Sequence, residues 1–195
     1  EKKVPESEQG VVALIQTETE RLKTHIEKVL ELSTLESGKS PYQLDIVDLL
    51  PVVEQLAKRY EDLARLEGFV FNAALPQEPI MVKADVHHWQ NALNNLFDNA
   101  KTYASDPVID FVVSREGDQW QFAIGDNGPG MTKSQKDLMF EKYYRAAASE
   151  SHHIKGYGLG LNFVQHIVKA HHGQINVTTA LGQGTTVSLT LRGHE

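Results

Sequence analysis

Two glycine clusters decide how this chain folds: Asp126-Asn127-Gly128-Pro129-Gly130 and Gly156-Tyr157-Gly158-Leu159-Gly160-Leu161. A polar segment between them carries Phe140-Glu141-Lys142-Tyr143-Tyr144-Arg145. Glycine serves where a backbone must take a positive φ or approach a ligand closely. Two such clusters around a basic, aromatic segment predict the rim of a phosphate site with a lid between them, although one cluster alone indicates only a turn.

The composition is that of an ordinary globular domain, alone or with an extension, with 195 residues of which 41% are hydrophobic and 23% charged. A formal charge of −7 and a pI near 5.7 argue against nucleic-acid binding. The lack of cysteine excludes disulfides and thiolate metal sites and fits a reducing compartment. No apolar run approaches the ~20 residues that cross a bilayer, so we expect no membrane contact by this chain.

A long amphipathic helix is predicted from Ser7 to about Ser37, ended by Gly38 and Pro41. Its seam follows the alternating spacing of a coiled coil, through Val12, Ile15, Thr19, Leu22, Ile26, Val29 and Ser33. Such a helix needs a partner, which is either the chain's own domain or the other half of a helical hairpin. We expect the hairpin, and therefore assign residues 1–40 and 41–195 to separate domains.

The second domain is predicted to be α+β. Its predicted strands lie at residues 44–47, 69–73, 80–83, 108–114, 120–126, 174–179 and 185–191. Its predicted helices run from a cap at Asp48 to about 66, from a cap at Asp85 to about 103, and from 158 to 170. This order favours a mixed, mostly antiparallel sheet with helices on one face, a two-layer α/β sandwich rather than a doubly wound parallel sheet.

Asp126 is the first candidate for a binding role. Trp120, Phe122 and Ile124 alternate onto one face of their strand, and Asp126 has the same parity. A buried carboxylate needs a partner, so a ligand amine is one interpretation of Asp126. The alternative is that Asp126 only caps the following turn.

A helix rich in asparagine is the second candidate. Trp89, Leu93, Leu96 and Ala100 form its apolar stripe, while the pair Asn95 and Asn99 shares another face. A side-chain carbonyl suits a magnesium ion that already carries phosphate oxygens. The alternative interpretation is a solvated polar face.

The second glycine cluster opens the helix that begins at Gly158. Backbone amides at a helix N-terminus bind phosphate by geometry and dipole. The cluster follows a polar loop rather than a strand, so a dinucleotide fingerprint does not fit. A flexible hinge remains the alternative.

The order and spacing of these motifs over residues 41–191 resemble the ATP-binding domain shared by sensor histidine kinases, type II topoisomerases, the Hsp90 chaperones and MutL, which has the Bergerat fold. In this family's terms, the N box is resembled by Asn95-Leu96-Phe97-Asp98-Asn99-Ala100. The first and second glycine boxes are resembled by the two glycine clusters, and the third by Gly182-Gln183-Gly184-Thr185. The F box resembles Phe140 to Arg145. This box and the long helix point to the histidine kinases.

The resemblance implies a role for each matching residue. Asp126 would bind the adenine amine, Tyr103 would pack on the adenine, and Asn99 would ligate Mg²⁺. The implied catalytic residues are Asn95, Asn99, Lys142 and Arg145. The implied ATP-binding residues are Asn95, Asn99, Thr102, Tyr103, Asp126, Gly128, Gly130, Tyr144, Gly156, Gly158, Leu159, Gly160, Leu161 and Thr185.

The resemblance also implies partners. The γ-phosphate would go to a histidine on an acceptor helix that this chain lacks, and then to the aspartate of a response-regulator receiver domain. The N-terminal helix would be the second helix of a dimerisation hairpin in a homodimer. The chain would be the soluble cytoplasmic portion of a membrane-bound bacterial sensor.

The chain departs from the family pattern at two positions of the asparagine-rich helix. Hydrolytic relatives carry a glutamate where Asn95 stands, and asparagine cannot activate water as a base; this favours phosphoryl transfer over hydrolysis. Thr102 stands where the family carries a basic residue. His25 lacks the neighbours of an acceptor histidine.

Two other functions remain open, a non-catalytic ATP-binding signalling module and a serine kinase of the anti-sigma type. The histidine pairs 87–88, 152–153 and 171–172 do not predict a metal site, because adjacent helical residues point in different directions. We expect His171-His172-Gly173 to be a helix end, where imidazole suits the dipole.

Overall fold

The computed structural model describes Val11, Val12, Ile15, Thr19, Ile26 and residues 42–104, 106–145 and 158–194. Contacts divide the chain into Glu1–Pro41 and Tyr42–Glu195. In the first unit the five described positions have helical backbone and exposed side chains, and the Thr19 hydroxyl donates to the Ile15 carbonyl over 2.7 Å. The rest of the helix predicted over residues 7–37 lies outside the described residues, so that helix and its hairpin role stay predictions.

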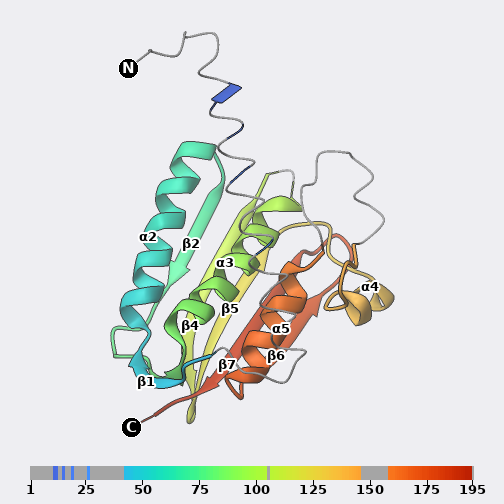
Figure 1. Ribbon diagram of the computed structural model, residues 1–195. Helices are drawn as coiled ribbons and strands as arrows, with labels where there is room; N and C mark the ends of the chain where they lie inside the picture. The colour runs from blue at the N-terminus through green and yellow to red at the C-terminus, as the bar shows by residue number, and fades with distance from the viewer. Residues whose placement is uncertain are drawn as a thin grey trace. The chain divides into compact units, whose positions relative to one another are not determined.

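A five-stranded sheet forms the floor of the second unit (Figure 1). Its strand order is β2-β4-β5-β7-β6. These strands are β2 (Val70–Ala74), β4 (Val108–Glu116), β5 (Gln119–Asp126), β7 (Thr185–Arg192) and β6 (Gln174–Thr179). Only the β2–β4 pair is parallel, so the predicted mixed, mostly antiparallel sheet is confirmed.

The first and third strands form a separate sheet. Strand β1 (Asp45–Asp48) pairs antiparallel with β3 (Met81–Ala84), and a single bridge joins Val82 to Gly193. The sequence pattern predicted β1 and β3 to within one residue, but it did not predict that these two strands form a sheet of their own.

Three helices cover one face of the five-stranded sheet: α2 (Leu50–Glu67), α3 (Val86–Thr102) and α5 (Gly160–Ala170) (Figure 1). A short fourth helix, α4 (Lys133–Leu138), lies in the segment that we predicted as a lid, where no helix was predicted. The two-layer α+β sandwich is therefore confirmed. None of the described helices is long and apolar enough to span a bilayer.

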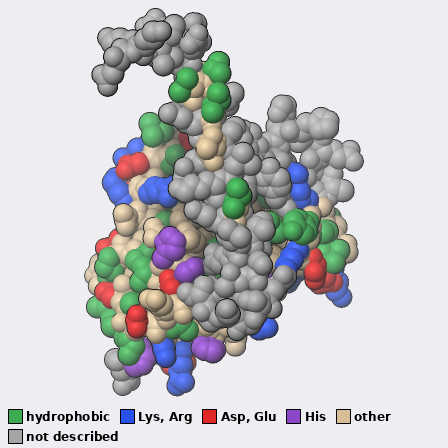
Figure 2. All heavy atoms as spheres, viewed as in Figure 1, with side chains coloured by type: hydrophobic (Ala, Val, Ile, Leu, Met, Phe, Trp, Pro, Cys, Tyr) green, Lys and Arg blue, Asp and Glu red, His purple; other side chains and the backbone are tan. Residues whose placement is uncertain are grey.

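The core lies between the sheet and the helices. Trp120, Phe122 and Ile124 on β5 are buried, as their alternation predicts, and the Phe122 ring lies 5.3 Å from that of Trp89 on α3. Each such burial contributes about 1.5–3 kcal/mol. Figure 2 shows Lys, Arg, Asp and Glu side chains dispersed over the visible face of the molecule. On α2, Lys58 and Arg65 each form an exposed ion pair with Asp62.

Of the two predicted helix caps, Asp85 is confirmed and Asp48 is wrong. Gly68 ends α2 with φ 79°, and Asp85 caps α3 by accepting from the His88 amide over 3.1 Å. Asp48 is not the cap of α2, which is Leu49. Instead, Asp48 Oδ1 accepts from the amides of Leu50 and Ile80, at 2.9 and 2.8 Å, and so ties the start of α2 to the chain before β3.

Candidate active site

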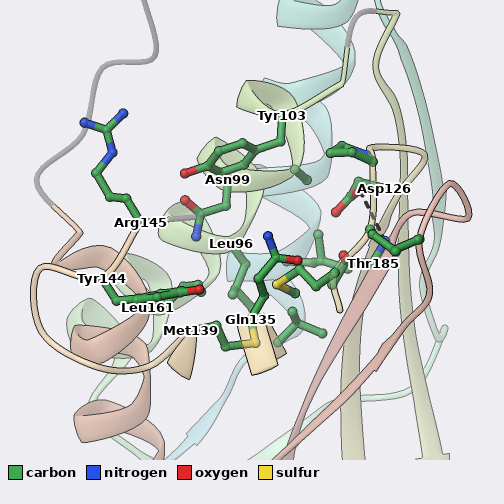
Figure 3. A pocket seen from close by; sticks show the side chains of 17 residues that line it. Leu96, Asn99, Tyr103, Asp126, Gln135, Met139, Tyr144, Arg145, Leu161 and Thr185 are labelled. Atoms are coloured by element: carbon green, nitrogen blue, oxygen red, sulfur yellow. Dashed lines mark hydrogen bonds between the residues drawn. The ribbon is translucent and has the colours of Figure 1, made fainter. Parts of the chain in front are cut away.

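A cavity of about 270 Å³ opens between α3, α4, the start of α5 and the ends of β5 and β7 (Figure 3). Most of its lining is apolar, and a few polar side chains converge on it, which is the usual make-up of a small-molecule site. Those polar side chains are Asn99, Tyr103, Asp126, Gln135, Tyr144, Arg145 and Thr185.

Asp126 makes the turn contact that one of its two sequence interpretations predicts. Its Oδ1 accepts from the amides of Gly128, at 2.8 Å, and Thr185, at 3.2 Å (Figure 3). Its Oδ2 receives no hydrogen bond from any residue that the structure describes. Burial raises the pKa of Asp126 above its ordinary value, and the two amide hydrogen bonds oppose that rise. One oxygen therefore fastens the turn, and the other is available to a ligand.

The glycines beside Asp126 are required by close packing. A Cβ on Gly130 (φ 65°) would lie 1.9 Å from the Ala180 carbonyl oxygen, and one on Gly184 (φ 78°) would lie 1.9 Å from that of Asp126. A Cβ on Gly128 would come within 2.8 Å of Asp126 Oδ1. These glycines let two loops touch and so hold Asp126 at the cavity.

Asn99 presents a second polar group to the cavity. Its amide nitrogen is buried and has no hydrogen-bond partner among the described residues. An unpaired buried amide costs about 1–3 kcal/mol, so its presence indicates a place for a ligand. Because amide oxygen and nitrogen can be exchanged by a side-chain flip, Asn99 can offer the ligand either a donor or an acceptor.

Asn95 and Thr102 lie away from the cavity. Asn95 is buried, its amide donates to the Asn91 carbonyl over 2.7 Å, and its Oδ1 lies 3.1 Å from where a Cβ on Gly160 would be. It therefore supports the start of α5. Thr102 is exposed, and its hydroxyl donates back to the Asp98 carbonyl.

The lid segment contributes Tyr144 and Arg145 to the cavity, while Lys142 does not line it. Tyr143 adopts φ 63°, and its amide donates to the Gly158 carbonyl over 3.0 Å. A Cβ on Gly158 would lie 2.7 Å from the Tyr143 carbonyl carbon, so glycine is needed where the lid meets α5.

The second glycine cluster is described from Gly158 onward, so Gly156 and Tyr157 lie outside the described residues. Leu159 is buried, and Leu161 lines the cavity. Tyr103, at the end of α3, lines the cavity and is 43% exposed as a residue. A partly exposed ring can pack on a planar ligand.

Several lining residues were not predicted. The apolar ones, among them Ile124, Met131 and Met139, cannot be told from core residues by their alternation. Gln135 could have been found, because Thr132-x-x-Gln135 is a capping-box pattern that predicts the helix α4.

His171 lies at the predicted helix end and also makes a tertiary contact. It ends α5 as predicted, but it is buried, and burial lowers its pKa. Its Nε2 accepts from the Asp85 amide over 2.9 Å, and its Nδ1 lies 2.7 Å from the Ile167 carbonyl. The ring is therefore a neutral link between α5 and α3 rather than a cation at a helix end. The described residues contain no group of three metal-binding side chains.

The comparisons with known proteins agree with this fold. Residues 84–195 match the family model described as histidine kinase-, DNA gyrase B-, and HSP90-like ATPase. The chain belongs to this family.

Among curated proteins, the chain is 31% identical to the sensor protein RprX of Bacteroides fragilis, over 97% of this chain and 37% of the relative. It is 27% identical to the sensor protein kinase WalK of Staphylococcus epidermidis, over 92% of this chain and 30% of the relative. The chain thus spans about a third of the length of these relatives. They confirm the predicted resemblance to sensor histidine kinases.

Two solved structures share the fold. One is full-length ShkA in complex with AMPPNP, with a TM-score of 0.79 and 21% identity over 97% of this chain and 40% of that chain. The other is the histidine kinase AdeS of Acinetobacter baumannii, with a TM-score of 0.75 and 22% identity over 100% of this chain and 88% of that chain.

Proposed function

We propose that this chain binds Mg-ATP in the cavity and is the catalytic portion of a sensor histidine kinase. One observation carries the proposal: the cavity has a carboxylate oxygen of Asp126 without a described partner and a buried, unpaired amide on Asn99. These two groups match the needs of a nucleotide, which carries an amine on its base and a metal on its phosphates.

Asp126 would hold the base. Its Oδ2 accepts a hydrogen bond from the adenine amine, while Oδ1 keeps the turn in place. Tyr103 and the apolar lining residues, such as Ile124, would pack on the faces of the ring.

Asn99 would hold the metal. Its amide oxygen fits Mg²⁺, a hard cation that prefers oxygen ligands and keeps phosphate oxygens in its shell. The bound ion would neutralise charge on the phosphates. Arg145 lines the same cavity, but its guanidinium points away from the other lining side chains (Figure 3). Both Arg145 and Lys142 would therefore have to move to add positive charge at the phosphates.

The acceptor would be a histidine rather than water. Asn95 is no base, and its amide already serves the packing of α3 on α5. We propose that the γ-phosphate passes to a histidine of an acceptor helix, and from there to the aspartate of a response regulator. The full-length protein would be a homodimeric, membrane-bound sensor.

The test is a calorimetric titration with a non-hydrolysable ATP analogue, with and without Mg²⁺. In Asp126→Asn the new amide keeps an oxygen for the turn but points a donor at the base amine, so we expect at least a tenfold loss of affinity with or without metal. In Asn99→Ala we expect the loss of mainly that part of the affinity which Mg²⁺ adds. Asn91→Ala is the matched control, because Asn91 lies on α3 outside the cavity.

The wild-type chain should bind the analogue, and the control should bind it equally well. No binding by the wild type, or equal binding by all variants, would contradict the ATP site. An unchanged Mg²⁺ increment in Asn99→Ala would contradict the metal role alone.

A second function is a non-catalytic ATP-binding module, and Thr102 favours it. It stands where the family carries a basic residue, yet it is exposed and bonded to its own helix. Transfer to a supplied acceptor distinguishes the two functions.

A further inference from the structure

The Gln135 side chain is held in one orientation by a capping box. The side-chain Oε1 of Gln135 accepts from the Thr132 backbone amide over 2.8 Å, and the backbone amide of Gln135 donates to the Thr132 hydroxyl over 3.3 Å. A backbone amide can only donate, so the atom that it meets must be the Gln135 oxygen. This fixes an assignment that a side-chain amide otherwise leaves open, and it directs Nε2 away from Thr132.

The free end of Gln135 faces the cavity. Gln135 lines the cavity, and its Nε2 has no hydrogen bond to any residue in the described part of the chain. Figure 3 shows the amide inside the ring of labelled side chains, with its nitrogen on the side of Asn99 and Tyr103. The residue is therefore fastened at its oxygen and offers a donor at its nitrogen.

The cavity thus combines an acceptor, Asp126 Oδ2, with a donor, Gln135 Nε2. A lone acceptor would bind the amine of any base. In adenine the amine is flanked by ring nitrogens that only accept hydrogen bonds. Guanine and hypoxanthine carry a carbonyl oxygen where adenine carries its amine, and that oxygen would face the Asp126 carboxylate. An acceptor together with a donor therefore favours adenine over guanine and hypoxanthine.

We propose that Gln135 is a specificity-determining residue whose Nε2 donates to a ring nitrogen of the adenine that Asp126 holds by its amine. This inference rests on the proposed function, because it requires a nucleotide in the cavity. It assigns α4 a direct part in reading the base.

The competing role is that Gln135 only caps α4. The two roles use different atoms, since a cap needs only the oxygen, which glutamate supplies equally well. Gln135→Glu therefore keeps the cap and replaces the donor with a second acceptor. Ser134→Glu is the matched control, because it adds the same charge at the neighbouring, exposed position of α4.

The experiment measures the affinity of these chains for ADP, 1-deaza-ADP and 7-deaza-ADP, with the melting temperature as a check on folding. We expect Gln135→Glu to melt like the wild type and to bind ADP about tenfold or more weakly than Ser134→Glu. One of the two deaza analogues should bind the wild type weakly. Its affinity should fall little further in Gln135→Glu, because the hydrogen bond is already missing. That analogue identifies the ring nitrogen that accepts from Gln135.

Equal ADP binding by Gln135→Glu and Ser134→Glu would overturn the inference and leave the ATP site standing. An equal loss for ADP and both analogues would also overturn it, because the donor would then serve the ribose or phosphates. If the wild type binds no adenine nucleotide, the proposed function itself fails.

Discussion

At the scale of single residues, Asp126 and Gln135 follow the same principle. Each has one polar atom fastened to the backbone and a second atom facing the cavity. The first atom fixes the rotamer, so the second is already oriented before a ligand arrives. Preorganisation of this kind reduces the ordering entropy that binding must overcome.

The buried charge of Asp126 leads to a prediction about stability. Because burial raises its pKa, the folded chain binds this proton more tightly than the unfolded chain. The stabilisation belongs to the protonated form and is lost as the pH rises through the folded pKa. At pH 7 the ionised carboxylate is therefore destabilising.

We expect Asp126→Asn to raise the free energy of unfolding at pH 7 by a few tenths of a kcal/mol to about 1 kcal/mol, after solvent screening is allowed for. The gain should shrink as the pH falls toward the folded pKa. Urea unfolding at several pH values measures it, with Asp137→Asn on the exposed face of α4 as the control. A gain that is independent of pH, or a loss at pH 7, would contradict the assignment.

Residue identity predicted part of the site. Asp126 was found because its parity on a buried strand makes a carboxylate conspicuous, and Asn99 because asparagine is an uncommon choice inside a helix. The same reasoning could not separate Asn95 from Asn99, because i and i+4 share a face. Only the packing of Gly160 against Asn95 distinguishes the two.

At the scale of elements, the loop between β6 and β7 holds Asp126 in position. Gly182 and Gly184 both adopt positive φ, at 73° and 78°. A Cβ on Gly182 would meet nothing within 4 Å, whereas one on Gly184 would collide with the Asp126 backbone. A side chain at either position would therefore strain the left-handed backbone conformation. Only at Gly184 would it also collide with neighbouring atoms.

We expect Gly182→Ala to lose about 1–2 kcal/mol of stability from backbone strain and to bind nucleotide normally. Gly184→Ala should lose more stability and at least tenfold in nucleotide affinity, because it displaces the turn that carries Asp126. Chemical unfolding and calorimetry measure both effects. Equal affinity in the two variants would show that this loop does not position the site.

The helices and strands were largely predictable from hydrophobic periodicity and from the residues that begin or end an element. Alternation on β5, the stripe on α3 and the glycine at the end of α2 each determine a local structure by themselves. The cap of α2 was mispredicted because Asp48 bonds to Ile80, which is distant in sequence. The split of β1 and β3 from the main sheet is likewise a tertiary outcome that local patterns do not contain.

At the scale of the whole molecule, the proposed histidine-kinase function requires an acceptor. The cavity is formed within Tyr42–Glu195, so nucleotide binding should not depend on the preceding unit. Phosphoryl transfer, by contrast, needs a histidine presented to the cavity, and the motifs of the chain predict that function without supplying the acceptor.

The most direct test incubates the chain with γ-labelled ATP, Mg²⁺ and a separately supplied acceptor hairpin from a sensor kinase of this family. The predicted result is acid-labile label on the hairpin histidine, little free phosphate, and no label when the chain carries Asp126→Asn. Acid-stable label on serine, label appearing mainly as free phosphate, or nucleotide binding with no transfer would contradict the histidine-kinase function.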